Sequence, residues 1–329
     1  MKLSILDQSP ILPGKTAAQA LQESLKLAKL GEDLGFSRYW IAEHHDINAL
    51  ACPAPEVMIS YIGAHTKEIQ LGAGAVLLPH YRPYRVAETF NLLATLFPNR
   101  IDLGIGRAPG GSAEATIALS GNFLEKVRKL PEDLKELIKF LHQDFSSEEM
   151  FSKIKPTPVP EVSPKVWVLG TSEKSAVLAA ENGTAYAFGQ FMSEKDGMEI
   201  IKTYKENFQG RTPEEKPEAI LAVSAICGET TEAADELAYH SFLRKNQIAK
   251  DSETDNYELT LEQEQMFVDM KNNMVIGDPQ EVVQKLHDMQ RQYGADEIMI
   301  ITITNSHESR IRSYELIAKE ISLTELNKI

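Results

Sequence analysis

The sequence predicts an α/β fold, namely a (β/α)₈ barrel of the TIM type. Short apolar runs alternate with helical stretches about eight times in a chain of 329 residues, which suits one barrel domain over 1–329. Most of these runs are continuously apolar, as expected for parallel strands that are buried on both faces. An open doubly wound sheet is the competing fold. Eight units in this length favour the barrel.

The first half of the chain supplies four of the predicted strands and three of the helices. The first helix follows Thr16, whose hydroxyl is typical of an N-cap, carries Leu21, Leu25 and Ala28 at helical spacing, and ends near Gly35. Further helices are expected over about 55–66 and 84–97. The four strands are predicted at Leu3–Leu6, Arg38–Ala42, Ile69–Leu78 and Ile101–Gly106.

The second half repeats the pattern. Helices are expected over about 173–182, 198–208 and 279–293, and from about Thr231 and Ser309 onward. Four strands are predicted at Val166–Leu169, Ala185–Phe188, Ala219–Cys227 and Glu297–Thr304.

Two long excursions interrupt the alternation, after the fourth and the seventh strand. The first spans about 60 residues and ends in a segment with four prolines, which we expect to be an extended loop. The second, residues 245–275, is polar and charged in its first half. We expect it to be a mobile lid within the barrel domain.

Charge and composition exclude several classes of protein. Lys and Arg number 34 against 48 Asp and Glu, and a net charge of −14 argues against a nucleic-acid binder. We expect no membrane span, because no apolar run approaches roughly 18 residues. The N-terminal segment lacks the apolar stretch of a signal peptide, and two cysteines make neither a disulfide framework nor a zinc site. We therefore expect a cytoplasmic protein.

A barrel carries its site at the carboxyl ends of its strands, and Glu43-His44-His45 ends the second one. A histidine there can act as a base, a hydrogen-bond donor or a metal ligand. Adjacent residues on a strand face opposite ways, so at most one of the two histidines points into the barrel. We therefore predict no metal site, and a partly exposed pair of loop histidines remains the alternative.

Glycines and one arginine mark the ends of the third and fourth strands. The run around Gly104 and Gly106 is no dinucleotide fingerprint, because Pro109 stands where a third glycine is needed. Arg107 could bind a phosphate at the barrel mouth, or it could be a solvated arginine in a tight turn. The small residues Gly72–Ala75 could seat a flat ligand or serve tight packing.

Hydroxyl side chains follow the fifth strand, at Thr171, Ser172 and Ser175. Together with the free N–H groups of a helix N-terminus they could bind an anion, although simple N-capping explains them equally. Because they follow the strand next to the one that precedes Arg107, both groups could contact one phosphate.

These segments together resemble the bacterial luciferase-like flavin monooxygenases, and the likeness is greatest to non-luminescent relatives of luciferase. The matching stretches lie in family order and cover most of the chain. They are RYWIAEHH, IQLGAGAVLLPHYRPYRVAE, NLLATLFPNRIDLGIGRAPG, VWVLGTSEKSAVLAAENG and GDPQEVVQKLHDMQRQYGADEIMI.

The resemblance implies a barrel that binds reduced FMN, delivered by a separate reductase, and uses dioxygen to oxygenate a small organic substrate. His44 matches the active-site histidine beside the flavin, and Gly74-Ala75 match a pair joined by a cis peptide under its ring. The phosphate-binding positions are matched by Arg107, Thr171, Ser172 and Ser175. A homodimer is also implied. Two departures are Gly106, where luciferase has a reactive cysteine, and Thr171, where it has an acidic residue.

Three other functions stay open at this point. A deazaflavin-dependent hydride-transfer oxidoreductase belongs to the same superfamily, and a flavin-binding protein without turnover would keep the same residues. An unrelated barrel enzyme, such as an aldolase, would need a catalytic Lys or Glu at a strand end. Glu43 is available there, whereas no Lys ends a strand cleanly.

Overall fold

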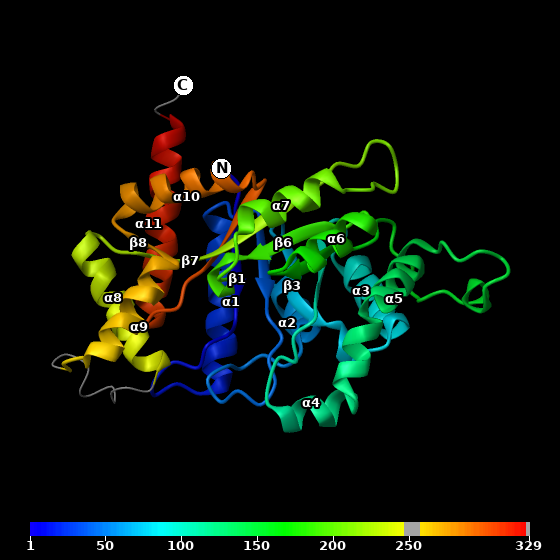
Figure 1. Cartoon of the computed structure of the whole chain (residues 1–329), viewed down its shortest axis with the longest axis horizontal. Helices are drawn as coiled ribbons and strands as arrows, with labels where there is room; N and C mark the ends of the chain where they lie inside the picture. The colour runs from blue at the N-terminus through cyan, green and yellow to red at the C-terminus, as the bar shows by residue number, and fades with distance from the viewer. Residues whose placement is uncertain (247–256, 327–329) are drawn as a thin grey trace.

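The computed structural model describes residues 1–246 and 257–326, and it confirms the predicted (β/α)₈ barrel. Eight parallel strands run round the barrel in the order β1 to β7 and then β9, and the pairing of β6 with β7 closes it. Helices surround the strands (Figure 1). The strands are β1 (Leu3–Asp7), β2 (Arg38–Ile41), β3 (Gln70–Leu77), β4 (Ile101–Gly106), β5 (Lys165–Gly170), β6 (Ala185–Gly189), β7 (Ala219–Cys227), β8 (Met274–Gly277) and β9 (Glu297–Ile301).

The helices begin where the sequence offers caps or prolines. Thr16 forms a capping box with Gln19, and proline opens three other helices, where its missing N–H costs nothing. The helices are α1 (Ala17–Asp33), α2 (Pro55–Gly63), η1 (Leu78–His80), α3 (Pro83–Leu96), α4 (Ala113–Ser120), α5 (Phe123–His142), η2 (Met150–Lys153), α6 (Glu173–Glu181), η3 (Gln190–Met192), α7 (Gly197–Glu206), α8 (Thr231–Lys245), α9 (Leu261–Asn272), α10 (Pro279–Tyr293) and α11 (His307–Leu326). None of these helices is both long and apolar enough to cross a membrane.

The two excursions contain structure that the sequence analysis did not predict. Helices α4 and α5 fill most of the first, and α5 continues through Pro131. Its end at 154–164 has neither helix nor strand, as expected. Of the predicted lid 245–275, residues 247–256 lie outside the described residues, and the remainder holds α9 and the start of β8. The strand β8 pairs with the far end of β7, outside the barrel.

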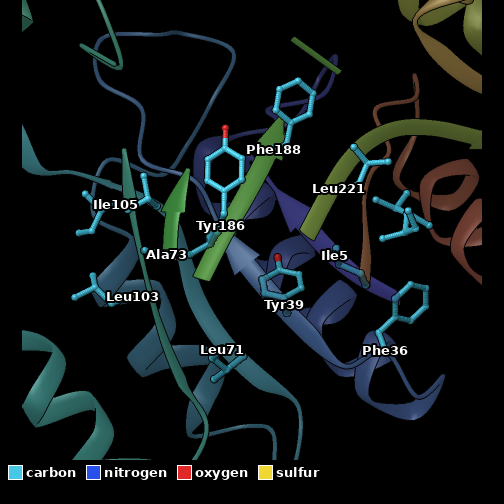
Figure 2. Packing of buried hydrophobic residues seen from close by; sticks show 14 of the residues in the cluster. Ile5, Phe36, Tyr39, Leu71, Ala73, Leu103, Ile105, Tyr186, Phe188 and Leu221 are labelled. Atoms are coloured by element: carbon cyan, nitrogen blue, oxygen red, sulfur yellow. The ribbon is translucent and has the colours of Figure 1, made fainter. Parts of the chain in front are cut away.

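The two largest apolar cores lie on the two faces of the sheet. The larger one packs outward-facing strand residues against the helices, and Figure 2 shows Tyr39, Leu71, Leu103 and Tyr186 among its members. The smaller one fills the barrel interior, where Trp40 and Trp167 meet edge to face with their ring centroids 5.3 Å apart.

A buried polar cluster holds these two indoles in place. Both donate their Nε1–H to the Asp102 carboxylate, at 2.9 and 3.0 Å, and Arg38 binds the same carboxylate at 2.6 Å. Arg38 also bonds Glu297 at 2.8 Å, so this buried arginine has two hydrogen-bonded carboxylate partners and each of the two acids is paired with it. The two indoles and this cluster therefore fill the barrel interior below its mouth.

Candidate active site

A cavity of about 840 Å³ opens at the carboxyl ends of the strands, within the usual size range of cofactor and ligand sites. Its floor includes Leu6, Trp40 and Met299 of the inner core. The cavity is lined by all seven residues that the resemblance matches to the active-site histidine and the cofactor-binding positions: His44, Gly74, Ala75, Arg107, Thr171, Ser172 and Ser175. Residues from the ends of four different strands therefore meet at one place.

The three consecutive residues after β2 have different surroundings. The Glu43 carboxylate is buried and accepts hydrogen bonds from the Leu77 N–H at 3.0 Å and the Tyr81 hydroxyl at 2.8 Å. His45 Nε2 lies 2.8 Å from the same carboxylate. Glu43 thus ties the β2 end to η1, and His45 faces Glu43 rather than acting as a free group.

His44 is the histidine of this pair that lines the cavity. Its backbone N–H donates to the Cys52 carbonyl at 3.0 Å, which fixes the chain at this point. Its Nδ1 is buried and has no hydrogen-bond partner among the described residues. Burial, and secondly the nearby His45, lower the pKa of His44 below its ordinary value, so the imidazole is neutral at neutral pH. A neutral imidazole with an unused nitrogen can accept a proton.

The two glycines of β3 have different surroundings. A Cβ on Gly72 would lie 2.6 Å from Trp40 Nε1, so Gly72 makes room for the packed indole. Gly74 lines the cavity, and a Cβ there would lie 2.8 Å from Leu6 Cδ1. The bond between Gly74 and Ala75 is a cis peptide, as the resemblance implies.

The end of β4 presents a cation to the cavity. Gly104 faces a neighbouring backbone, because a Cβ there would lie 2.2 Å from the Ala73 carbonyl oxygen. Gly106 and Arg107 both line the cavity, and Arg107 is exposed. In the described part of the chain Arg107 has no ion-pair partner, so its guanidinium is available to an anion.

The hydroxyls at the start of α6 cap the helix and also line the cavity. Ser172 is the N-cap, and its side chain accepts the Ser175 N–H at 3.4 Å. Ser175 Oγ donates to the Ser172 carbonyl at 2.6 Å and lies 3.1 Å from the Tyr186 hydroxyl. A Cβ on Gly170 would lie 2.3 Å from Ser175 Oγ, so the glycine makes room for that hydroxyl. Ser172 therefore caps the helix, and Thr171 and the first turn of α6 line the cavity.

Comparison with known proteins agrees with this architecture. The family model described as luciferase-like monooxygenase matches residues 1–297. The chain belongs to this family. An uncharacterized protein of Bacillus subtilis (strain 168), YwcH, is 38% identical over 326 residues, which cover 96% of this chain and 98% of the relative. An N-acetyl-S-alkylcysteine monooxygenase of the same strain is 34% identical and covers 98% of each chain.

Solved structures share the fold of this luciferase-like protein. The crystal structure of apo-MsnO8 superposes with a TM-score of 0.84 at 33% identity and covers 98% of both chains. Two more distant structures share the fold alone. One is the oxygenating constituent of 3,6-diketocamphane monooxygenase from Pseudomonas putida in complex with FMN, at 20% identity and a TM-score of 0.70, over 97% of each chain. The other is an F420-dependent secondary alcohol dehydrogenase, at 14% identity and a TM-score of 0.65, over 97% of this chain and 98% of that one.

Family membership sets aside the unrelated barrel enzymes that the sequence had left open. Of the two more distant structures that share the fold, one is in complex with FMN and the other is F420-dependent. Among the described residues, no group of three His, Cys, Asp or Glu side chains could hold a metal ion.

Part of the cavity lining in this luciferase-like barrel was not predicted from the sequence. Helix α5 contributes Val127, Leu130, Pro131 and Leu134, and α6 adds Lys174 to the cavity wall. The leucines at positions 130, 134, 137 and 141 follow helical spacing, so the sequence held a signal for α5. No feature of the sequence indicates which face of α5 lines the cavity.

Proposed function

We propose that this protein is a flavin-dependent monooxygenase that uses reduced FMN and dioxygen to oxygenate a small organic substrate. The observation that carries the proposal is the convergence of a neutral histidine, an unpaired arginine and a capped helix N-terminus on one cavity. The monooxygenases among the relatives support the same reaction class.

The phosphate of FMN would bind between β4 and β5. Arg107 supplies a positive charge there that no carboxylate compensates in the described part of the chain. The N-terminus of α6 adds N–H groups and the positive end of a helix dipole, and Thr171 adds a hydroxyl. Gly106 leaves the backbone beside Arg107 open to close approach by the cofactor.

The flavin ring would lie above Gly74 and Ala75, where a flat group meets backbone rather than side chains. Trp40, Leu6 and Met299 close the site below it with apolar surface. A reduced flavin held here would supply the electrons that activate dioxygen, so that one oxygen atom would pass to the substrate and the other would leave as water. The apolar walls exclude water from that reaction.

His44 is the residue that we propose to handle protons in this site. Its unpartnered Nδ1 and its lowered pKa make it a proton acceptor at neutral pH. The Glu43 carboxylate holds the residue before His44, and the Cys52 carbonyl accepts the His44 N–H itself, so that the backbone is fixed before a ligand binds.

The setting of the reaction follows from the same resemblance. We propose that a separate reductase supplies reduced FMN, that two copies of the chain form a homodimer, and that the protein works in the cytoplasm.

Two other functions use the same cavity. A deazaflavin-dependent hydride-transfer enzyme shares the fold, but the structure in that class is 14% identical, whereas a monooxygenase relative is 34% identical. A flavin-binding protein without turnover would have no need for a neutral histidine with an unused nitrogen.

Anaerobic titration of the purified protein with reduced FMN, followed by flavin absorbance, tests the cofactor. We expect saturable binding at one site per chain, and weaker binding of a reduced deazaflavin by about tenfold or more. Tighter binding of the deazaflavin would favour hydride transfer instead. Failure to bind either cofactor would refute the assignment.

A further inference from the structure

Gln8 at the end of β1 is a polar group of the cavity that the proposed flavin chemistry does not use. It follows Leu6 by two residues, and side chains two apart on a strand share a face. Leu6 belongs to the inner core, and both residues line the cavity. The β1–β2 register pairs Asp7 with Ile41, so Gln8 lies level with Ala42, close to the end of the strand that carries His44.

The residues on both sides of Gln8 are held outside the cavity by buried hydrogen bonds. Asp7 binds Arg310 at 2.8 Å and also accepts a bond from the Tyr39 hydroxyl. The Ser9 N–H donates to Asp7 Oδ1 at 2.8 Å, and Ser9 Oγ lies 2.9 Å from Ser24 Oγ.

The backbone at this point is fixed as well. Ser9 has a φ of 50°, a left-handed conformation that non-glycine residues adopt at a cost. The Ser9 carbonyl also accepts the Ala51 N–H at 3.0 Å. Since Asp7 and Ser9 are both held in place, the backbone fixes the direction in which Gln8 projects.

The Gln8 carboxamide has no hydrogen-bond partner in the part of the chain that the structure describes. An amide carries one acceptor oxygen and two donor hydrogens, and leaving them unmatched against an apolar ligand costs free energy. The neighbouring walls offer no such match, because Leu6, Trp40, Ala42 and Met299 are apolar there.

Charge is distributed unevenly along the cavity. Of the described lining residues with charged side chains, all except Glu43 lie between Arg107 and Glu181, on the β4 to α6 side. Glu43 accepts its hydrogen bonds from Tyr81, His45 and the Leu77 backbone. A ligand on the Gln8 side therefore meets uncharged polar groups within an apolar wall.

We propose that Gln8 recognises the substrate, and that this substrate is an uncharged, mostly apolar molecule with an amide-like group that both donates and accepts hydrogen bonds. This rests on the proposed function, since it assigns the remaining half of the same cavity. A carboxylate group at this place would lose its hydration without finding a positive charge among the described residues that line this side. An ammonium group would find only the Glu43 carboxylate, which already accepts hydrogen bonds from Tyr81, His45 and the Leu77 backbone.

Three probes of the same chain length test the proposal: hexanamide, hexanoate and hexylamine. Their dissociation constants are measured by ligand-observed NMR, with and without oxidised FMN. We expect the wild-type protein to bind hexanamide about tenfold more tightly than either charged probe. Gln8→Leu should lose that preference, and Gln8→Glu should shift it toward hexylamine. Gln284→Leu, on the exposed face of α10, is the matched control and should behave like the wild type.

The outcomes separate this inference from the proposed function. Equal binding of the three probes by the wild type, or an amide preference that survives Gln8→Leu, would overturn the role of Gln8. An amide preference that depends on Gln8 in a protein that binds no FMN would support the role of Gln8 and refute the flavin assignment. Unchanged FMN affinity in Gln8→Leu shows that the variant is folded and that the residue acts on the substrate side.

Discussion

At the end of β2, each of three adjacent residues has a different role: Glu43, His44 and His45. Glu43 is the buried anchor, His45 is its partner at 2.8 Å, and His44 is the one that lines the cavity. The alternation of a strand predicted that at most one histidine could face inward. The sequence could not say which one, because that depends on where Glu43 finds the Leu77 N–H and the Tyr81 hydroxyl.

At this scale the first prediction concerns His44. Under the proposed function, replacing it with alanine removes the proposed proton acceptor but leaves the residues proposed to bind the FMN phosphate and ring unchanged. We expect His44→Ala to bind reduced FMN within about twofold of the wild type and to convert dioxygen to hydrogen peroxide instead of product. Peroxide formed per dioxygen consumed measures this. Oxygenation as efficient as that of the wild type would exclude His44 from proton transfer.

The second prediction concerns Arg107. Arg107→Ala should weaken FMN binding by about 1.5–3 kcal/mol, the scale of a charge-assisted hydrogen bond, or roughly 10- to 150-fold in Kd. Arg128→Ala is the control, because Arg128 is exposed on α5 and does not line the cavity. Equal affinities of the two variants, measured by calorimetry, would remove Arg107 from the phosphate site.

At the scale of elements, glycines decide how closely β3 and β4 approach. Gly104 faces the Ala73 carbonyl, which cannot move, whereas Gly106 faces the Ala75 Cβ at 3.0 Å and the end of the Leu77 side chain at 3.2 Å. From the sequence alone, either a ligand or another backbone segment could lie against these glycines. Gly104 serves packing and Gly106 lines the cavity. This difference can be recognised only once the pairing of the two strands is known.

This difference gives a third prediction. Gly104→Ala should lower the free energy of unfolding by about 3 kcal/mol, because the barrel must distort to accommodate the Cβ. Gly106→Ala should cost about 1 kcal/mol, since its neighbours can yield by a few tenths of an ångström. Guanidinium unfolding of the two variants measures both. A loss for Gly106→Ala as large as that for Gly104→Ala would contradict the packing described here.

Local signals explain which elements the sequence predicted well. Thr16, Pro55, Pro83 and Pro279 mark helix starts by their own chemistry, and the apolar runs mark the barrel strands. Strand β8 has only four residues and pairs with the part of β7 that extends beyond the barrel. No local sequence pattern distinguishes so short a strand from a loop. Helix α5 continues through Pro131, against the usual effect of proline, and its leucines at positions 130, 134, 137 and 141 pack in the core.

For the whole molecule, the bond between Asp7 and Arg310 joins the first strand to the last helix. Burial alone raises the pKa of Asp7, but Arg310 and the hydroxyls of Ser24 and Tyr39 outweigh it, so the net pKa lies below the ordinary value. The unfolded chain therefore binds a proton more readily than the folded one. This contribution to stability is complete above the unfolded pKa of about 3.9 and is lost as the pH falls toward the folded one.

The fourth prediction follows from that linkage. Asp7→Asn should destabilise the protein by about 3–5 kcal/mol at neutral pH, because Arg310 stays buried without its partner. Between pH 5 and pH 3, about the window set by the carboxyl pKa, the variant should lose less stability than the wild type. Urea unfolding at both pH values measures the difference, with the exposed Asp33→Asn as control. An unchanged pH dependence in Asp7→Asn would contradict the linkage.

The central claim is that this luciferase-like barrel holds reduced FMN in a site that controls its reaction with dioxygen. The most direct test is to form the complex with reduced FMN without oxygen, mix it rapidly with oxygenated buffer, and record the flavin spectrum over time. Our account predicts that the oxidised spectrum returns at least about tenfold more slowly than for free FMN. Reoxidation of the bound flavin at the rate of the free cofactor would contradict it.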